Sequence, residues 1–443
     1  MLQKFKNKLN KDANLKELLS GSAVTFAIKI TGMLIGYGVV LLVSRKYGAE
    51  GTGIYSLTTS LLNSLAIFGG LGLNIAVLRY VGQFNKTENG LANMRKLFSY
   101  IFQFAFPFAV LVGISLFLLA EEVATKLFEN PMYIPALKVG AVALPFFTLN
   151  LINVEFIRGL KMLKVSEYLR SINRQLVVII LLLLSVFSFG ILDAVYAMVV
   201  GILISFVISM AYIGKYFKQH KSQDETSNLE RKELLKTSMP MMITAVASFI
   251  LANAGVVFLE IYSTTDQVGI FNVCVRLAQL VSLVLVVVNT ISAPKFAELF
   301  WAGKMVELQN VIRQSSRIIF LASFPISLFL MLFSSFVLGL FGKEFTTGTL
   351  ALLVLIIGQM VNASAGSVGI FLNMSGNERL LRNLIVFTVL LTLIGYLAFI
   401  PKYGIVGAAF ASTFGTVLLN VACVQQTYKK LKIKTYYLPF LSK

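Results

Sequence analysis

The chain has 443 residues, of which 57% are apolar, and its 39 Lys and Arg residues outnumber 20 Asp and Glu residues to give a net charge of +19. A mean hydropathy of +0.80 argues against an ordinary soluble domain. The positive charge does not indicate nucleic-acid binding, because the cations border the ends of apolar runs instead of gathering on one soluble face.

Apolar runs of about 20 residues recur along the chain, and this length crosses roughly 30 Å of hydrocarbon as a helix. The first run is too long for a signal peptide and lacks a small-residue cleavage site, so we expect it to remain as a span. The predicted fold class is an all-α polytopic membrane protein with twelve transmembrane helices. The predicted spans are 19–43, 54–78, 97–120, 137–157, 172–190, 194–214, 237–261, 269–293, 316–341, 348–372, 384–400 and 405–425.

The distribution of Lys and Arg predicts the orientation of these spans. With the N-terminus inside, 31 of the 39 cations fall on the cytoplasmic side, counting Arg174 and Arg317 at the ends of their spans, and six fall on the outer side, counting Lys138 at the end of its span. Positively charged residues are retained on the cytoplasmic side when the connecting loops are short. Both termini are therefore predicted to be cytoplasmic.

The longest polar interval, 215–236, divides the spans six and six, and we expect it to be a cytoplasmic linker between an N-lobe over 19–214 and a C-lobe over 237–425. Residues 1–18 form a predicted amphipathic cytoplasmic N-terminus, and 426–443 a basic cytoplasmic tail.

Internal similarity supports a duplicated six-helix unit, because three pairs of segments recur in the same order at nearly one offset. An even number of spans gives both lobes one orientation, so a pseudo-two-fold axis along the membrane normal is expected to relate them, with a cavity between. The pairs are GIYSL at 53–57 with GIFNV at 269–273, AVLRYVGQF at 76–84 with SAPKFAELF at 292–300, and GILDAVYA at 190–197 with GIVGAAFA at 404–411.

The connector after the eighth span is amphipathic. Its apolar residues recur at intervals of three to five with charges between them, a pattern that suits a helix in the membrane interface or one packed on the protein's own cytoplasmic face. Both interpretations stay open. The residues are Phe296, Trp301, Met305, Leu308 and Ile312.

Two cations, Lys29 and Arg276, lie deep within predicted spans, seven or more residues from either end, and there is one in each lobe. Insertion of a cation into the centre of a span costs about 2.5–3.5 kcal/mol on insertion scales, so the presence of these two residues requires a functional or structural explanation. We expect both to face the cavity and to bind an anionic group. The alternative is that both side chains reach an interface by snorkelling.

Other polar residues within spans are candidates for substrate binding or gating. Glu155 and Arg158 are spaced to pair on one helix face, where they could gate or couple transport, although a plain interfacial ion pair is the simpler interpretation. Amides turn inward to find partners, so they could bind sugar hydroxyls or make contacts between helices. The candidate amides are Asn74, Asn153, Asn253 and Gln279.

No metal-ligand cluster, nucleophilic triad or nucleotide motif is present in the sequence, and no cofactor is expected. Cys274 and Cys423 fall inside predicted spans, where a cysteine is usually a small apolar packing residue. Coupling to H⁺ or Na⁺ remains open.

The first spans, with the segment GSAVTFAIKITGMLIGYGVVLLVSRKYGAEGTGIYSL at 21–57, resemble the polysaccharide and O-antigen flippases of the MATE-like MOP exporter superfamily. The likeness extends over six plus six spans, short outer loops and the PKYGIVGAAFA entry to the last span.

This resemblance implies a non-enzymatic flippase of the plasma (inner) membrane that moves a polyprenyl-diphosphate-linked oligosaccharide to the outer leaflet. The expected partners are this substrate, membrane lipids and polysaccharide assembly enzymes. The protein itself is expected to be a monomer. The alternatives are an ion-coupled multidrug exporter, an integral-membrane polymerase or glycosyltransferase, and a membrane scaffold. Lys29 occupies a span in which drug exporters often carry a carboxylate, which favours an anionic cargo.

Overall fold

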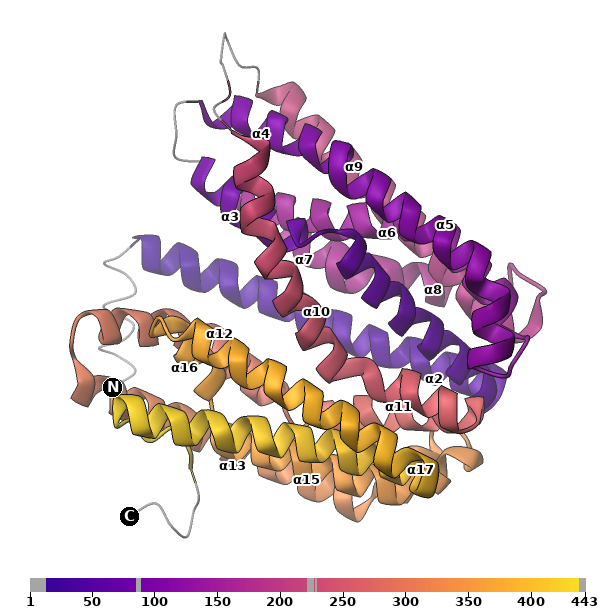
Figure 1. The fold of residues 1–443 in the computed structure, drawn as a ribbon. Helices are drawn as coiled ribbons and strands as arrows, with labels where there is room; N and C mark the ends of the chain where they lie inside the picture. The colour runs from indigo at the N-terminus through magenta and orange to yellow at the C-terminus, as the bar shows by residue number, and fades with distance from the viewer. Residues whose placement is uncertain (1–12, 85–88, 221–226, 228, 438–443) are drawn as a thin grey trace. The chain divides into compact units, whose positions relative to one another are not determined.

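The structure is a computed structural model that describes residues 13–84, 89–220, 227 and 229–437 (Figure 1). All regular secondary structure in these residues is helical, as the sequence predicts. Each of the twelve predicted spans falls mainly on helix. The N-terminal segment 1–12, most of the linker between 221 and 228, and the last six residues of the predicted tail lie outside the described part.

Two helices are long enough to hold two predicted spans each, and each is broken by a glycine. Helix α2 (Ala13–Gly69) has Gly48 at φ 67° and ψ −167°, and helix α17 (Glu378–Leu431) has Gly404 at φ 52° and ψ −129°. Positive φ is strained for residues with a Cβ, so glycine suits these positions. Both breaks fall where the sequence places a short outer turn.

Within the described residues, seven helices are long and apolar enough to cross a membrane, or eight if the bent pair α11 (Thr265–Gln279) and α12 (Leu283–Trp301) is counted as one span. Two of the seven are the long helices α2 and α17, which hold two predicted spans each. The chain is thus a multi-pass helical membrane protein. Twelve crossings remain a prediction.

The chain packs as two units that are not contiguous in sequence. Unit 1 comprises residues 1–42, 62–126 and 130–245, and unit 2 comprises 43–61, 127–129 and 246–443. Helix α10 (Arg231–Tyr262) contributes to both units, and so does α2. The predicted lobe boundaries stay predictions.

In unit 1, helix α6 is central and packs against α3, α5 and α9, while α8 packs against α9. Short π-helical stretches continue α4, α5 and α7. The helices are α3 (Leu73–Phe84), α4 (Gly90–Tyr100), α5 (Phe106–Glu122), α6 (Tyr133–Gly159), α7 (Leu163–Tyr168), α8 (Arg174–Leu183) and α9 (Asp193–Gln219).

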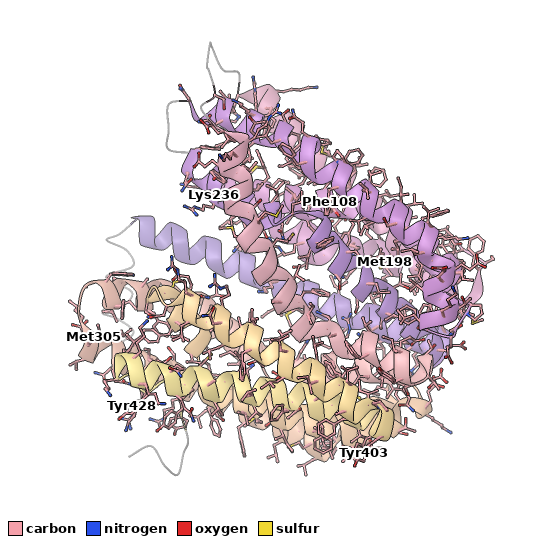
Figure 2. All side chains as sticks on the ribbon, in the orientation of Figure 1. Phe108, Met198, Lys236, Met305, Tyr403 and Tyr428 are labelled. Carbon is pink, nitrogen blue, oxygen red and sulfur yellow. The ribbon has the colours of Figure 1, made fainter. Side chains whose placement is uncertain are left out.

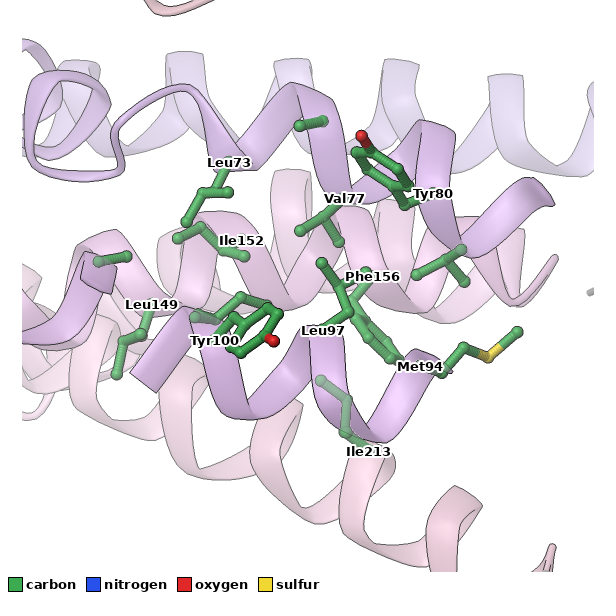
Figure 3. Packing of buried hydrophobic residues seen from close by; sticks show 14 of the residues in the cluster. Leu73, Val77, Tyr80, Met94, Leu97, Tyr100, Leu149, Ile152, Phe156 and Ile213 are labelled. Atoms are coloured by element: carbon green, nitrogen blue, oxygen red, sulfur yellow. The ribbon is translucent and has the colours of Figure 1, made fainter. Parts of the chain in front are cut away.

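The main hydrophobic core of unit 1 joins α3, α4, α6 and α9 (Figure 3). Phe98, Phe156 and Phe217 pack edge to face around it, with ring centroids 5.6 to 5.9 Å apart. Such aromatic pairs add about 0.5–1.5 kcal/mol each beyond the area that they bury. Phe156 has no exposed surface.

In unit 2, helix α15 packs against α11, α13 and α17. The two halves of α17 fold back on each other, since Gly407 lies against the backbone of Phe399 and Gly415 lies against Thr392. The predicted spans 384–400 and 405–425 are therefore antiparallel neighbours. The remaining helices are α13 (Met305–Leu332), α14 (Ser334–Gly339), α15 (Thr349–Ala365) and α16 (Val368–Met374).

Exposed tyrosines mark both ends of the second half of α17. Tyr403 is 60% exposed and Tyr428 is 46% exposed (Figure 2). Tyr403 directly precedes the break at Gly404, and the helix from Ile405 to Tyr428 is about 35 Å long at 1.5 Å per residue, which is enough to cross the hydrocarbon core of a bilayer.

Removal of the Phe156 ring is expected to destabilise unit 1. Phe156→Ala leaves a cavity in the core, and such truncations cost about 3–5 kcal/mol. The matched control is Phe117→Ala, at a position that is 42% exposed. Thermal unfolding in detergent should show a clearly lower Tm for Phe156→Ala and nearly native behaviour for Phe117→Ala. Equal shifts would contradict this assignment of the core.

Candidate functional site

The two predicted intramembrane cations lie on helices of different packing units. Lys29 lies on α2 and is half-buried. Arg276 lies on α11, also half-buried, and its Nε donates to Oδ1 of Asn272 at 2.9 Å. Asn272, one helical turn earlier, therefore helps to orient the guanidinium group. Their roles in substrate binding remain proposals.

The four candidate amides have different environments. Asn153 on α6 is fully buried and donates to Ser209 Oγ at 3.0 Å, so it links α6 to α9. Asn253 on α10 donates to the Phe249 carbonyl of its own helix at 3.1 Å. Gln279 is exposed at the end of α11, and Asn74 is half-buried on α3.

Two of these amides retain hydrogen-bonding capacity. The Oδ1 atoms of Asn74 and Asn153 are buried and accept no hydrogen bond within the described part of the chain. A buried acceptor without a partner costs about 1–3 kcal/mol, so such atoms are usually met by water or a ligand. Sequence reasoning missed a similar link, in which Asn173 donates to Ser205 Oγ at 2.7 Å.

The ion pair predicted between Glu155 and Arg158 forms, with Oε2 and Nη1 3.6 Å apart. Arg170 makes the shorter contact, with Nη2 2.5 Å from Glu155 Oε1, and its Nε lies 3.4 Å from Glu167. Sequence reasoning missed Arg170 because the turn between α6 and α7 brings it back from 15 residues away. The role of this cluster in gating or coupling remains a proposal.

A close helix crossing in unit 2 joins segments 49–53 and 265–269. A Cβ on Gly53 would overlap the carbonyl oxygen of Thr265, and a Cβ on Gly269 would overlap the carbonyl oxygen of Ala49. The contact is reciprocal, because residues 49 and 265, like residues 53 and 269, are related by the repeat offset of 216. We call it the glycine crossing. The sequence repeat indicated these segments but not that they touch.

Polar contacts tie the α2 side of the glycine crossing to the segment 340–344. Glu344 Oε1 accepts a hydrogen bond from the Ala49 backbone N–H at 2.6 Å, and Arg45 Nε donates to the Leu340 carbonyl at 2.6 Å. At the second glycine break, Gln267 Oε1 accepts from the Ile405 N–H at 3.1 Å. Each break thus has a side-chain oxygen capping the residue that follows the glycine, which satisfies a donor freed by the interrupted helix.

The described residues contain no group of three His, Cys, Asp or Glu side chains placed to hold one metal ion. Both cysteines are buried as free thiols. The expectation of no cofactor, with H⁺ or Na⁺ coupling unassigned, remains a prediction.

Comparison with known families identifies the chain. Residues 18–300, well over half of the sequence, match the family model described as "Polysaccharide biosynthesis protein". The chain belongs to this family. The family resemblance expected from the sequence is thereby confirmed.

The name of one similar protein states an activity. The probable low-salt glycan biosynthesis flippase Agl15 of Haloferax volcanii is 21% identical over 55% of this chain and 50% of its own length. The chain thus matches about half the length of that relative.

Solved structures of two transporters share the fold. The lipid II flippase MurJ in an inward closed conformation has a TM-score of 0.70 at 16% identity, covering 92% of this chain and 87% of MurJ. An inward-facing multidrug resistance MATE transporter of the MOP superfamily also has a TM-score of 0.70, at 14% identity, covering 93% of this chain and 98% of that transporter. These likenesses show a common fold. The names that state an activity describe flippases and transporters, not enzymes.

A methyl group at Gly53 is expected to separate the glycine crossing. Overpacking of a close contact typically costs about 1–3 kcal/mol, so Gly53→Ala should lower the thermal stability of the purified protein. Gly369→Ala is the control, because a Cβ there would have no neighbour within 4 Å. An unchanged Tm for Gly53→Ala would contradict the close approach.

Proposed function

We propose that this family member is a flippase that moves a polyprenyl-diphosphate-linked oligosaccharide from the cytoplasmic to the outer leaflet of the plasma (inner) membrane. The observation that carries the proposal is the family match over residues 18–300. The shared fold with a lipid II flippase supports it, since that protein is named as a flippase of a lipid. The proposal makes the protein a transporter, with the substrate and membrane lipids as its main partners.

Lys29 and Arg276 are the proposed partners of the diphosphate. A lipid diphosphate that leaves water needs positive charges, because a desolvated anion is costly unless it is paired. Both side chains are half-buried and thus retain a face for a ligand. Asn74 and Asn153 supply buried acceptors, suited to sugar hydroxyls, while Asn253 and Gln279 complete the proposed polar set. A cationic path of this kind favours an anionic cargo over the cationic drugs of multidrug exporters.

Alternating access of two lobes, over 19–214 and 237–425, is the proposed mechanism. Twelve spans with both termini in the cytoplasm would place the glycine crossing at the outer surface, where it would close the outer side. Most of its contact is between backbones, so the segments can separate without leaving a buried charge unpaired. We propose that Glu155 and Arg158, with Arg170, form an ion cluster on the cytoplasmic side of the N-lobe that rearranges as the lobes move. The energy source, H⁺ or Na⁺, is left open.

Transport in liposomes tests the cation role most directly. The experiment follows a fluorescent polyprenyl-diphosphate oligosaccharide into the outer leaflet for native protein, Lys29→Ala and Arg276→Ala. Loss of one of two charge partners should slow translocation at least about tenfold, which corresponds to 1.4 kcal/mol in the barrier. Lys29→Arg and Arg276→Lys keep the charge and are expected to retain more activity than the alanine variants.

Native rates in correctly folded alanine variants would remove both cations from the mechanism. Export of cationic dyes with no movement of the lipid-linked glycan would instead identify a multidrug exporter.

The ion cluster gives a separate test of gating. Arg170→Gln removes the closer partner of Glu155, whereas Arg158→Gln removes the more distant one. If the cluster is a gate, Arg170→Gln should change the transport rate more than Arg158→Gln, with both proteins stable to within about 1 kcal/mol, as expected for partly exposed ion pairs. If both variants transport at the native rate, the cluster has no role in gating and is purely structural.

A further inference from the structure

The residues after α17 form an ordered strap on unit 2. Helix α17 ends at Leu431, and Lys432, with φ 57°, turns the chain out of the helix. Residues then alternate in burial: Lys432 and Lys434 are exposed, whereas Ile433 and Thr435 are 4% and 1% exposed. We call residues 432–437 the C-terminal strap. Its period of two directs both lysines outward.

Hydrogen bonds fix the strap along α13. Gln309 brackets Lys434, donating from Nε2 to its carbonyl at 2.8 Å and accepting its N–H at Oε1 at 2.9 Å. Ser316 Oγ, two turns further along the same helix, donates to the Thr435 carbonyl. The backbone of the strap is therefore held at two successive residues.

The end of the strap is tied to a second helix. The Tyr437 N–H donates to the Ser364 carbonyl of α15 at 2.9 Å. The ring of Tyr437 also lies 5.7 Å from the ring of Phe320 on α13, measured between centroids. The strap thus bridges α13 and α15 at its far end.

An apolar contact anchors the start of the strap. Ile433 packs into a buried cluster with Phe296, Leu308 and Phe371. The strap is therefore held by buried side chains on one face, while its other face is charged.

Further cations surround the exposed lysines. Arg313 is exposed and lies on the helical stripe of Gln309 and Ser316, which the strap follows. Lys429 and Lys430, in the last turn of α17, are also exposed. Two acidic residues near the turn between α12 and α13 are neutralised by ion pairs. Glu298 Oε1 lies 2.7 Å from Lys295 Nζ, and Glu307 Oε1 lies 3.5 Å from Lys304 Nζ. The strap surface therefore carries a net positive charge.

An apolar rim lies at the same end of unit 2. Trp301, the single tryptophan of the sequence, is 72% exposed, and its indole Nε1 donates to the Met374 carbonyl at 3.2 Å. Val306 is 79% exposed, and Met305 is labelled with Tyr428 at this end in Figure 2. Phe296 and Leu308 of the same connector are buried. The connector therefore packs on the protein with one face and leaves an apolar face exposed.

We infer that the strap surface, made by Arg313, Lys429, Lys430, Lys432 and Lys434, binds the headgroups of anionic phospholipids in the leaflet at this end of unit 2. Clustered cations beside a membrane attract anionic lipids with about 1 kcal/mol per residue, or about fivefold. An exposed tryptophan and valine next to cations match the boundary between headgroups and acyl chains. This inference requires a membrane protein but not the proposed flippase activity.

Tryptophan quenching in liposomes tests the inference, since all the tryptophan signal then comes from Trp301. The full chain is placed in bilayers in which the brominated acyl chains are carried either by phosphatidylglycerol or by phosphatidylcholine, at equal mole fraction. We expect stronger quenching by brominated phosphatidylglycerol for the native protein, with a preference that weakens as salt is added. Lys432→Gln with Lys434→Gln should weaken the preference clearly, because it removes two of the five cations.

Two variants separate a strap site from a general charge effect. Gln309→Ala removes the bracket without changing charge and should also weaken the preference. Lys343→Gln removes an exposed cation from the turn before α15 and should leave it unchanged. Equal quenching by both lipids in the native protein would overturn the inference, as would an unchanged preference in the double lysine variant or in Gln309→Ala. The lipid-linked oligosaccharide is absent throughout, so failure here would not bear on transport.

Discussion

The glycine crossing is the contact on which the proposed transport cycle depends. Gly53 and Gly269 allow two backbones to meet where any side chain would overlap a carbonyl oxygen. Small residues favour such close approach in membranes, where van der Waals packing drives helix association. Because the two segments occupy equivalent positions of the repeat, one duplicated sequence feature supplies both sides of the contact. Glu344 and Arg45 then add polar contacts at its edge.

The polar residues of the spans divide into scaffold and candidate site. Asn153 and Asn173 link neighbouring helices, and Gln267 and Glu344 cap backbone donors at the two glycine breaks. These structural partners explain the presence of Asn173, Gln267 and Glu344, whereas Asn153 also keeps a buried Oδ1 without a hydrogen bond among the described residues and so belongs to the candidate site as well. Lys29 and Arg276 are half-buried cations, for which an anionic substrate gives a functional reason. The division explains why many polar residues can occur in an apolar bundle while few of them contact a cargo.

Hydropathy and charge spacing were sufficient to predict the helical class and the pair between Glu155 and Arg158, and the resemblance of the first spans was sufficient for the family. They could not predict that a single glycine at positive φ, Gly48 or Gly404, makes each of the two breaks with helix on both sides of it, because a single positive φ has no periodic signature. Arg170 was missed since its contact depends on a turn. The ordered C-terminal strap was missed because its lysines resemble a solvated tail, and only the burial of its alternate residues shows that it packs. The placement of the cations around a cavity stays a prediction.

Opening of the glycine crossing is the central claim, and a distance measurement tests it most directly. Glu50 and Asp266 are exposed residues, one in each segment of the crossing, and are related by the repeat offset, so spin labels can replace them in a protein whose Cys274 and Cys423 have been changed to alanine. Double electron–electron resonance should show one short distance without substrate, and a second, longer population when lipid-linked oligosaccharide and an ion gradient are supplied. A single unchanged distance under active transport would contradict the account.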